Sequence, residues 1–425
     1  MKTAISIILL SLLCSCSSKE RVQVTAPNDY NAYLNSPPVK TTSKYFELWN
    51  SKIKSDSLQL MSFGNVASEY TRFFKETGDI LYLKKAEKSL LKATEIAAVG
   101  KSGYYRALAR NYISQHRFKE ALQWAEKAHT LGSGLQASQG LLFDIHMELG
   151  HYDTAKTYLD RIRNHAEFDY LIRAAKWNDY KGNLEVAIRY LEKARKKSES
   201  ANNRNLKLWT YTNLADFYGH AGRIEESYQH FLKALEIDSH NAYAKKGIAW
   251  IVFSHEKNAK EALRILDAVT EVNKAPDYHI LRAEIASYLN EGEMKNAALD
   301  SFYNEIQDLA YGPMYDSHAI AFYLEHTNEY KKAIRLAEQE VKNRATPETY
   351  DLLAYAYFKN GNLSKAYDLV STFVEGKTYE PKALFHLAEI YKAKGLKNAV
   401  QRLKEELDSA DFEMGPSFSY QLSTL

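Results

Sequence analysis

Few residues of this 425-residue chain form a pattern that could do chemistry. Gly100-Lys101-Ser102-Gly103 matches the end of a phosphate-binding loop, but Glu95 stands where that loop needs its first glycine. His255-Glu256 begins like the helix of a zinc protease, yet Ala259 occupies the position of the second histidine. Ser133 lies between two glycines, with no predicted strand to present it as a nucleophile. We therefore predict neither a catalytic centre nor a cofactor.

Metal binding and nucleic-acid binding are not indicated either. The thirteen histidines are scattered, and the pairs His318 with His326 and His230 with His240 lack the i, i+4 register that brings two imidazoles together on one helix. The 56 basic and 53 acidic residues give a net charge of +3, which is too balanced for a nucleic-acid surface. We predict no metal site and no nucleic-acid partner.

The N-terminus carries a signal for export. Lys2 is followed by an apolar run over residues 4–13, which is too short to span a membrane but has the length of a signal peptide. The run ends in Leu13-Cys14-Ser15-Cys16, which resembles the lipobox of bacterial lipoproteins. This resemblance implies cleavage before Cys16, acylation of that residue with chains such as palmitate, and attachment to a membrane without a spanning helix.

Two further details bear on the anchor. Cys14 is the weaker candidate for acylation, because bulky Leu13 precedes it where a small residue is expected, and an ordinary secretory signal stays the alternative. Ser17, rather than an aspartate, follows Cys16, which favours the outer membrane of a bacterial cell envelope. The chain has no other cysteine, so the folded part must be stabilised by its core without disulfides.

A repeat with a period near 34 residues runs through most of the chain. Pro313, Pro347 and Pro381 stand 34 residues apart. We predict turn residues at a similar interval, at His116, Gly150, Gly182, Gly222, Glu256, Gly292, Asn328, Gly361 and Gly395. A small residue follows five positions later in most units, as Ala121, Ala155, Ala187, Ser227, Ala297, Ala333 and Ala366, with a slip of one residue at Ala262 and at Ala399. Such a fixed period is typical of a repeat array.

Each unit is predicted to be a helical hairpin. Apolar and small residues at intervals of three, four and seven form one helix face, and a glycine between two such runs suits a left-handed helix C-cap. The three spaced prolines fit first helical turns, where a missing N–H costs nothing. The polar stretch at 195–203 lengthens one spacing to 40 residues and predicts a long loop between two units.

The units are similar in sequence to tetratricopeptide repeats. The runs Tyr211-x-x-Leu214-Ala215-x-x-Tyr218-x-x-x-Gly222 and Tyr350-x-x-Leu353-Ala354-x-x-Tyr357-x-x-x-Gly361 carry this resemblance. Nine units fit, and a more divergent tenth lies upstream around Gly78. The resemblance implies an all-α fold, a superhelical solenoid of about ten repeats. We expect four regions: a signal peptide at 1–15, a flexible tether at 16–43, the array at 44–408, and a tail at 409–425 that could cap the last repeat.

The resemblance also implies a binding face. In this family the first helix of each unit lines a concave surface and exposes the residues ten, six and three positions before the turn. In the N-terminal units these residues are charged, namely Arg106, Arg110, Asp144, Lys176 and Asp179. In the C-terminal units they are mostly aromatic, namely Trp250, Phe253, His318, Phe322, Tyr355, Phe358 and Phe385. We predict a partner that covers these rings, and the alternative is that they belong to the core between repeats.

Two classes of function follow. The first is a non-catalytic scaffold, anchored to a membrane through Cys16, which binds a protein or peptide segment in its groove. The second is a lipoprotein that captures a glycan, as the helical starch-binding proteins of outer membranes do, with aromatic rings stacked on sugars. Those proteins build their ligand site from large insertions, which this chain lacks, so we favour the scaffold. An enzyme ranks third.

Overall fold

The structure, a computed structural model, describes residues 23–36, 40–54, 56 and 58–425. The predicted signal peptide and Cys16 lie outside the described residues. Within them the chain contains helices and no strand, and most of the helices pair into ten antiparallel hairpins. The pairs are α3 (Leu60–Thr77) with α4 (Ile80–Ile96), α5 (Lys101–Ser114) with α6 (Phe118–Thr130), α7 (Leu135–Glu148) with α8 (Tyr152–Arg161), α9 (Phe168–Tyr180) with α10 (Leu184–Ser200), α11 (Arg204–His220) with α12 (Ile224–Ile237), α13 (Ala242–Trp250) with α14 (Ala259–Thr270), α15 (Asp277–Tyr288) with α16 (Gly292–Glu305), α17 (Asp316–Phe322) with α18 (Tyr330–Asn343), α19 (Pro347–Lys359) with α20 (Leu363–Phe373), and α21 (Pro381–Ala393) with α22 (Lys397–Leu407).

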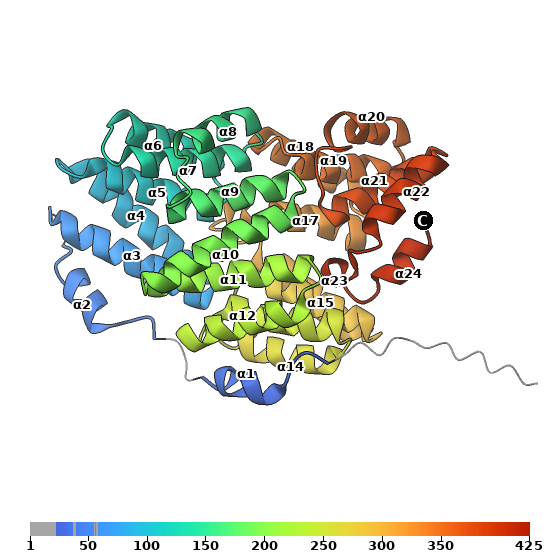
Figure 1. Cartoon of the computed structure of the whole chain (residues 1–425), viewed down its shortest axis with the longest axis horizontal. Coiled ribbons are helices and arrows are strands. Elements are labelled where there is room, and N and C mark those ends of the chain that lie inside the picture. Colours follow the sequence, from blue (N-terminus) through green and yellow to red (C-terminus); the bar gives the residue numbers. More distant parts are fainter. Residues whose placement is uncertain (1–22, 37–39, 55, 57) are drawn as a thin grey trace, which may run out of the picture.

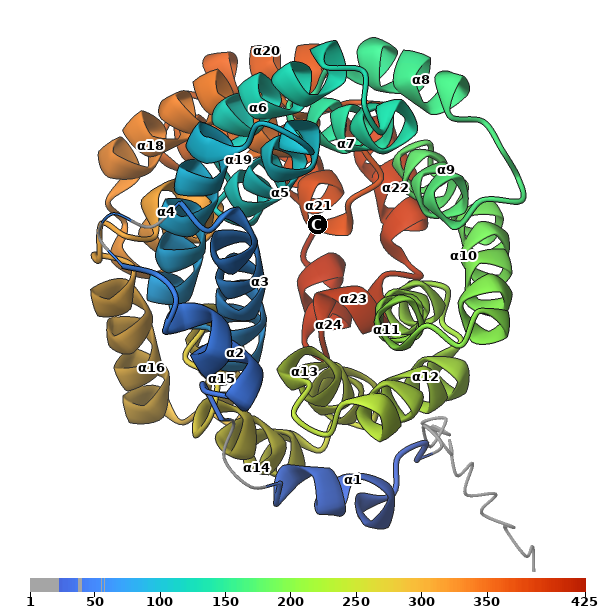
Figure 2. The same cartoon turned by 90° about the vertical axis from the view of Figure 1, so that its left-hand side faces the viewer.

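The hairpins stack into a superhelix whose first helices lie on the inner side and whose second helices lie on the outer side (Figure 2). The predicted turn residues His116, Gly150, Gly182, Gly222, Asn328, Gly361 and Gly395 all have positive φ, as left-handed C-caps require. The small residues five positions later are buried at Ala121, Ala155, Ala187, Ser227, Ala333 and Ala366. The predicted all-α solenoid of about ten repeats is therefore confirmed.

The sequence slip near residue 256 has a structural cause. The first helix of this unit ends in a π-helical segment, η1 (Ile251–His255), in which the N–H of Glu256 donates to the carbonyl of Ile251, five residues earlier. A π-helix accommodates one extra residue. The left-handed turn residue is therefore Lys257, not Glu256, and Ala262 follows it by the usual five positions.

Three other local predictions are wrong. Asn290, not Gly292, is the left-handed turn residue of its unit, and Ala298 is buried there in place of Ala297. Val400 is buried five positions after Gly395, so the slip to Ala399 does not exist. The polar stretch at 195–203 is not a long loop, because α10 continues to Ser200.

Part of the predicted flexible tether is ordered and packs against the array. Helix α1 (Pro27–Leu34) lies beside α12 and α14 (Figures 1 and 2). The carboxylate of Glu256 accepts hydrogen bonds from the backbone N–H groups of Val24 and Thr25, at 2.8 and 2.7 Å. Tyr30 is only 1% exposed and donates to Glu261 at 2.6 Å. The prediction of a tether is therefore corrected for residues 23–36, because a buried tyrosine and a carboxylate from a distant repeat fix them.

Successive turns of the superhelix contact each other along a seam. The N–H of Lys274 donates to the carbonyl of Thr77 at 2.7 Å, and the side-chain amide of Asn273 donates to the carbonyl of Glu76, 197 residues earlier. Further along, Arg344 forms an ion pair with Glu148, 196 residues earlier, at 3.2 Å. One apolar cluster joins Ile80 and Leu83 of the first turn to side chains of α15–α17. The seam therefore closes the superhelix on itself after about six hairpins.

The C-terminal tail does more than cap the last repeat. It contains α23 (Asp411–Met414) and α24 (Phe418–Ser423), and it lies inside the ring of hairpins (Figure 2). Phe418 is fully buried in the cluster of the last repeats, next to Phe385. Helix α23 crosses the interior and contacts α11 and η1. The tail thus joins the end of the array to its middle.

Two glycines with the same backbone conformation allow the cost of overpacking the seam to be measured separately from the cost of backbone strain. Gly78 and Gly222 have nearly equal φ values of 69° and 70°, but a Cβ on Gly78 would lie 2.5 Å from the backbone nitrogen of Ala275, whereas a Cβ on Gly222 meets nothing. We expect Gly222→Ala to lower the free energy of unfolding by about 1–2 kcal/mol through strain alone. Gly78→Ala should cost about 1–3 kcal/mol more through overpacking, measured by urea unfolding. Equal losses would show that the seam contributes little.

Candidate functional site: the inner face of the superhelix

The inner face near the N-terminus is a network of charged side chains from successive first helices. The guanidinium of Arg106 donates to the carbonyl of Ser133 at 2.9 Å and lies over Gly134, where a Cβ would be 2.8 Å from it. Arg173 packs on Gly140 in the same way and forms an ion pair with Asp144 at 2.7 Å. Small residues on one helix thus make room for an arginine from the neighbouring hairpin.

Arg110 is the cation of this network that lacks a partner. Its guanidinium makes no hydrogen bond or ion pair with any residue that the structure describes. Burial within the superhelix lowers the pKa of Arg110, and the nearby charge of Arg173 acts in the same direction. A guanidinium keeps its charge at neutral pH despite such a shift, so Arg110 presents an unpaired positive charge on the inner face.

Lys176 is a structural residue rather than a free binding group. Its ammonium lies 2.7 Å from a carboxylate oxygen of Glu148, whose second oxygen pairs with Arg344 from the next superhelical turn. Burial in this region opposes the charge of Glu148, but Lys176 and Arg344 outweigh that effect and hold the pKa of Glu148 below its usual value. Lys176 therefore takes part in the seam, and its place on the inner face does not make it available to a partner.

Unpaired carboxylates gather farther along the inner face, around a cavity of about 390 Å³. Asp179 comes from α9, Glu348 from α19, Glu380 from the start of α21, and Glu413 from the tail. None of the four forms an ion pair with a described residue. Burial raises the pKa of Glu380 to about 7, helped by Glu413 and Glu348, and burial beside Asp179 raises the pKa of Glu413 to about 7. The cavity is therefore short of positive charge.

A smaller cavity of about 210 Å³ lies on the other side of the tail. Asp216 and Tyr243 share a hydrogen bond of 2.6 Å at its wall, and Lys246, which also lines it, forms an ion pair with Asp277 at 2.9 Å. Burial raises the pKa of Asp216 to about 6. Trp250, Phe412 and Glu413 complete the wall, so the tail separates the two cavities.

Three of the predicted aromatic residues belong to the core. Phe253 is 1% exposed, Phe322 8% and Tyr355 6%. Phe322 packs in the cluster that closes the seam, and Tyr355 stacks on His386 with its hydroxyl donating to Glu389 at 2.7 Å. The prediction that these three rings face a groove is wrong. For Phe253 the reason is the extra residue of η1, which turns its side chain into the core.

The other predicted residues have mixed surroundings. Phe358 is half-buried against the C-terminal core, and Phe385 packs on Phe418 of the tail. The ring of His318 contacts Phe302 and Tyr315 but stays exposed at the surface, and desolvation by the surrounding superhelix lowers its pKa. Trp250 is half-buried, and its indole N–H donates to the carbonyl of Phe412 at 3.0 Å. Trp250 and Phe385 are therefore the predicted aromatic residues that contact the tail, and Trp250 does so through a hydrogen bond to its main chain.

Two residues of the inner face, Ser254 and Glu413, were not among the predicted binding residues. Ser254 donates to the same carbonyl of Phe412 at 2.7 Å, and it stands three positions before the true turn residue Lys257. Counting from Lys257 instead of Glu256 selects Ser254 in place of Phe253. Glu413 lies outside the repeats, so the period contains no information about it.

One hairpin of the array matches a known repeat family. The model of the tetratricopeptide repeat matches residues 210–241, which form the hairpin of α11 and α12 and extend to the turn after it. The ten stacked hairpins repeat this unit along the chain. The chain is a tetratricopeptide repeat protein. Comparison with the curated proteins finds no match.

Solved tetratricopeptide and other helical proteins are similar to the array at low identity. A tetratricopeptide repeat protein from Parabacteroides merdae shares 16% identity over 55% of this chain and 92% of its own, with a TM-score of 0.38. Yeast Tom70 shares 14% over 86% and 94%, with a TM-score of 0.36. A Rap protein in complex with competence and sporulation factor shares 13% over 62% and 79%, with a TM-score of 0.45. Likenesses this weak indicate nothing about the function of this array.

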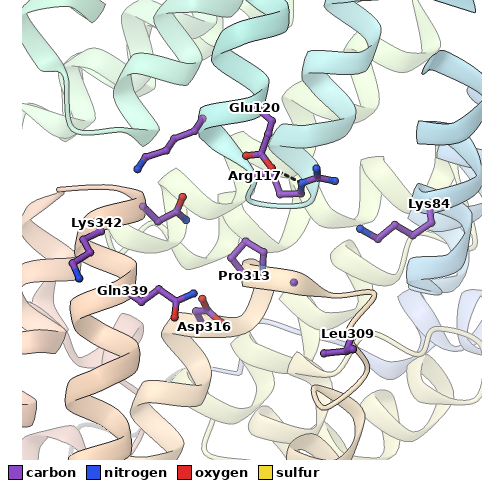
Figure 3. A pocket seen from close by; sticks show the side chains of 11 residues that line it. Lys84, Arg117, Glu120, Leu309, Pro313, Asp316, Gln339 and Lys342 are labelled. Carbon is purple, nitrogen blue, oxygen red and sulfur yellow. Dashed lines mark hydrogen bonds and ion pairs between the residues drawn. The ribbon is translucent and has the colours of Figure 1, made fainter. Parts of the chain in front are cut away.

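The array has one more cleft, of about 610 Å³, at the seam (Figure 3). Lys84, Arg117, Lys342 and Asp316 line it, together with Pro313, which lies in the 3₁₀ segment η2 (Gly312–Tyr315). Arg117 is already paired with Glu87 and Glu120. Throughout the described part of the chain, this cleft included, no group of three or more histidine, cysteine or acidic side chains could hold a metal ion. None of the helices described is long and apolar enough to cross a membrane.

The core assignment of the aromatic residues predicts a loss of stability. Phe322→Ala should lower the free energy of unfolding by about 3–5 kcal/mol, because it empties a buried site in the seam cluster. Leu309→Ala removes a side chain that is 94% exposed, and it should change stability little. Urea unfolding of both variants measures the difference. If the Phe322→Ala protein is as stable as the wild type, the core assignment of this ring is wrong and its assignment to the groove stands.

Docking of the tail should depend on pH. Because the docked tail raises the pKa of Glu413 from its ordinary value near 4.5 to about 7, docking is strongest below pH 4.5 and weakens up to pH 7. Asp179 and Glu380 oppose the negative charge of Glu413. His220 favours the charged forms of Asp179 and Glu380, and Lys176 favours that of Asp179. We expect hydrogen-exchange protection of residues 411–415, corrected for intrinsic rates, to be higher at pH 5 than at pH 8. Glu413→Gln should flatten this change, and Glu405→Gln on the exposed face of α22 should not.

Proposed function

We propose that this tetratricopeptide array is a non-catalytic scaffold that binds a segment of a protein partner on its inner face, and that acyl chains on Cys16 anchor it to a bacterial envelope membrane. One observation carries the binding role. The inner face holds two open cavities lined by charged and aromatic side chains of several hairpins, and a stretch of polypeptide already runs between them. A surface that accommodates one polypeptide segment through backbone hydrogen bonds is suited to accommodate another.

The general properties of tetratricopeptide arrays support the same function. Tetratricopeptide arrays generally bind protein or peptide partners and are generally not enzymes. Some charged side chains of the inner face pair with one another, as Arg173 does with Asp144. Others form no ion pair with a described residue, namely Arg110, Asp179, Glu348, Glu380 and Glu413, and these suit recognition of a partner through charge. Glycan capture was motivated by exposed aromatic rings, and Phe253, Phe322 and Tyr355 are buried, so the structure gives that alternative no support.

The ordered N-terminal segment bears on how the anchor would orient the array. Residues 24–34 pack on the edge formed by α12 and α14. An extended chain spans at most about 3.5 Å per residue, so lipid on Cys16 would keep Val24, and with it this edge, within roughly 30 Å of the membrane. A lipidation site so close to a docked helix favours a scaffold held close to the membrane over one attached through a long flexible linker.

Anchoring is tested on the two cysteines. In a bacterial host that is fed labelled palmitate, Cys16→Ala should abolish incorporation of label and move the protein from the membrane to the soluble fraction, because two acyl chains on one residue give stable attachment. Cys14→Ala is the matched control and should keep both the label and the membrane location. Incorporation into the Cys16→Ala protein would contradict the assignment of the anchor.

Binding is tested with the chain that begins after the signal peptide. Capture from an envelope extract, followed by identification of the bound proteins, is compared with a glycan array. We expect a defined protein partner whose retention decreases at high salt, since screening weakens charge recognition. A glycan signal without any protein partner would favour the alternative function.

A further inference from the structure

The tail segment Asp411–Gly415 occupies the inner face in the manner of a bound peptide. Its Phe412 ring lies on Gly219 of α11, where a Cβ would be 2.5 Å from the ring. Gly219 lies in the last turn of α11, and its lack of a side chain is what lets the Phe412 ring approach the helix this closely. Every other residue at position 219 would close the space that the ring fills.

The array holds the main chain of the segment as well as its ring. The carbonyl of Phe412 accepts two hydrogen bonds, from the indole N–H of Trp250 at 3.0 Å and from the hydroxyl of Ser254 at 2.7 Å. Both donors belong to the junction of α13 and the π-helical η1, which places them together. Bonds to a backbone carbonyl do not depend on which residue supplies it, so a segment from another protein could accept them equally.

The segment is bounded by features that let it leave without unfolding the last repeat. Gly415 has a φ of 88° and lies against the carboxylate of Glu284, and there the chain turns away. Phe418, three residues later, is buried in the C-terminal core and keeps the end of the tail in place. Phe412, Glu413 and Met414 are only half-buried, and cavities remain on both sides of them.

The charge of the tail is poorly matched to this place. Glu413 faces the cavity that Asp179, Glu348 and Glu380 line, and the nearest basic residues, Lys176 and Arg344, are already paired with Glu148. His220 also lines this wall, together with three tyrosines. A cationic side chain in the position of Glu413 would replace repulsion by attraction to three carboxylates.

We propose that the groove of Gly219, Trp250 and Ser254, together with the acidic cavity beside it, binds an extended partner segment in which an aromatic residue is followed by lysine or arginine. Residues Asp411–Gly415 fill this groove until such a segment displaces them. This inference rests on the proposed function, in that the inner face binds protein, and it adds the chemistry of the partner segment and the internal competitor.

The test uses two fluorescent peptides and the whole mature chain. One peptide has the sequence of residues 409–417, and the other has the same sequence with the Glu413→Lys change. Phe412→Ala should vacate the groove, so fluorescence anisotropy should show both peptides binding this variant at least about tenfold more tightly than the wild type. The lysine peptide should bind at least about fivefold more tightly than the glutamate peptide at low salt, with the ratio falling as salt rises.

Control variants locate the binding. When Ser254→Ala or Trp250→Phe is added to Phe412→Ala, the lysine peptide should bind at least about fivefold more weakly, since each change removes one hydrogen-bond donor to the peptide's backbone carbonyl. Tyr420→Ala changes an exposed tail residue and should behave as the wild type. A folded Phe412→Ala protein that binds neither peptide, or that binds a scrambled peptide equally well, would overturn the inference.

A second measurement does not depend on vacating the groove. In the intact chain, Glu413→Lys should strengthen docking of the tail, which would raise hydrogen-exchange protection of residues 411–415 and reduce binding of the lysine peptide. A loosened tail in this variant would also overturn the inference. If the peptides bind but no partner is found in the envelope extract, the proposed function fails and the groove assignment stands. If an envelope partner is found and the Ser254→Ala and Glu413→Lys variants still retain it, the groove assignment fails and the proposed function stands.

Discussion

The contact between successive turns of the superhelix is the interaction on which the rest of this structure depends. In an open array each repeat contacts only its neighbours, and the array bends as a one-dimensional stack. Here Lys274 bonds to Thr77 and Arg344 pairs with Glu148, so residues almost 200 positions apart are held together. Gly78 and Gly150 allow this approach because a Cβ on either would collide with the backbone of the opposite turn. The diameter of the ring is thereby fixed.

A fixed ring decides which side chains meet on the inner face. Asp179 on α9 and Glu380 at the start of α21 are far apart in sequence, yet they line one cavity because their hairpins lie on opposite sides of the seam. The same closure pairs Glu148 with cations from both turns and so removes Lys176 from the set of free binding groups. The acidity of the cavity is thus a property of the closed superhelix and of no single repeat.

The sequence contains the local part of this fold and little of the rest. The period, the left-handed turns and the small residues at the hairpin contacts depend on neighbours a few residues away, and they could be predicted. The π-helical segment at Ile251–His255 could not, since one added residue shifts the register, and the shift exchanged Phe253 for Ser254 on the inner face. Docking of Tyr30 beside Glu261 joins residues 231 positions apart, and no periodic pattern contains such a contact.

The tail shows why a self-occupied groove can still be a binding site. A segment covalently joined to its groove has an effective concentration in the millimolar range, so a partner in solution must bind each contact better than the tail does. Phe412 packs directly on Gly219, and an aromatic residue of a partner would make the same contact. Glu413 is the weak contact, because it adds a fourth carboxylate to Asp179, Glu348 and Glu380. The advantage of a partner must therefore come from charge at that one position, and this makes the groove selective for a cation beside an aromatic ring.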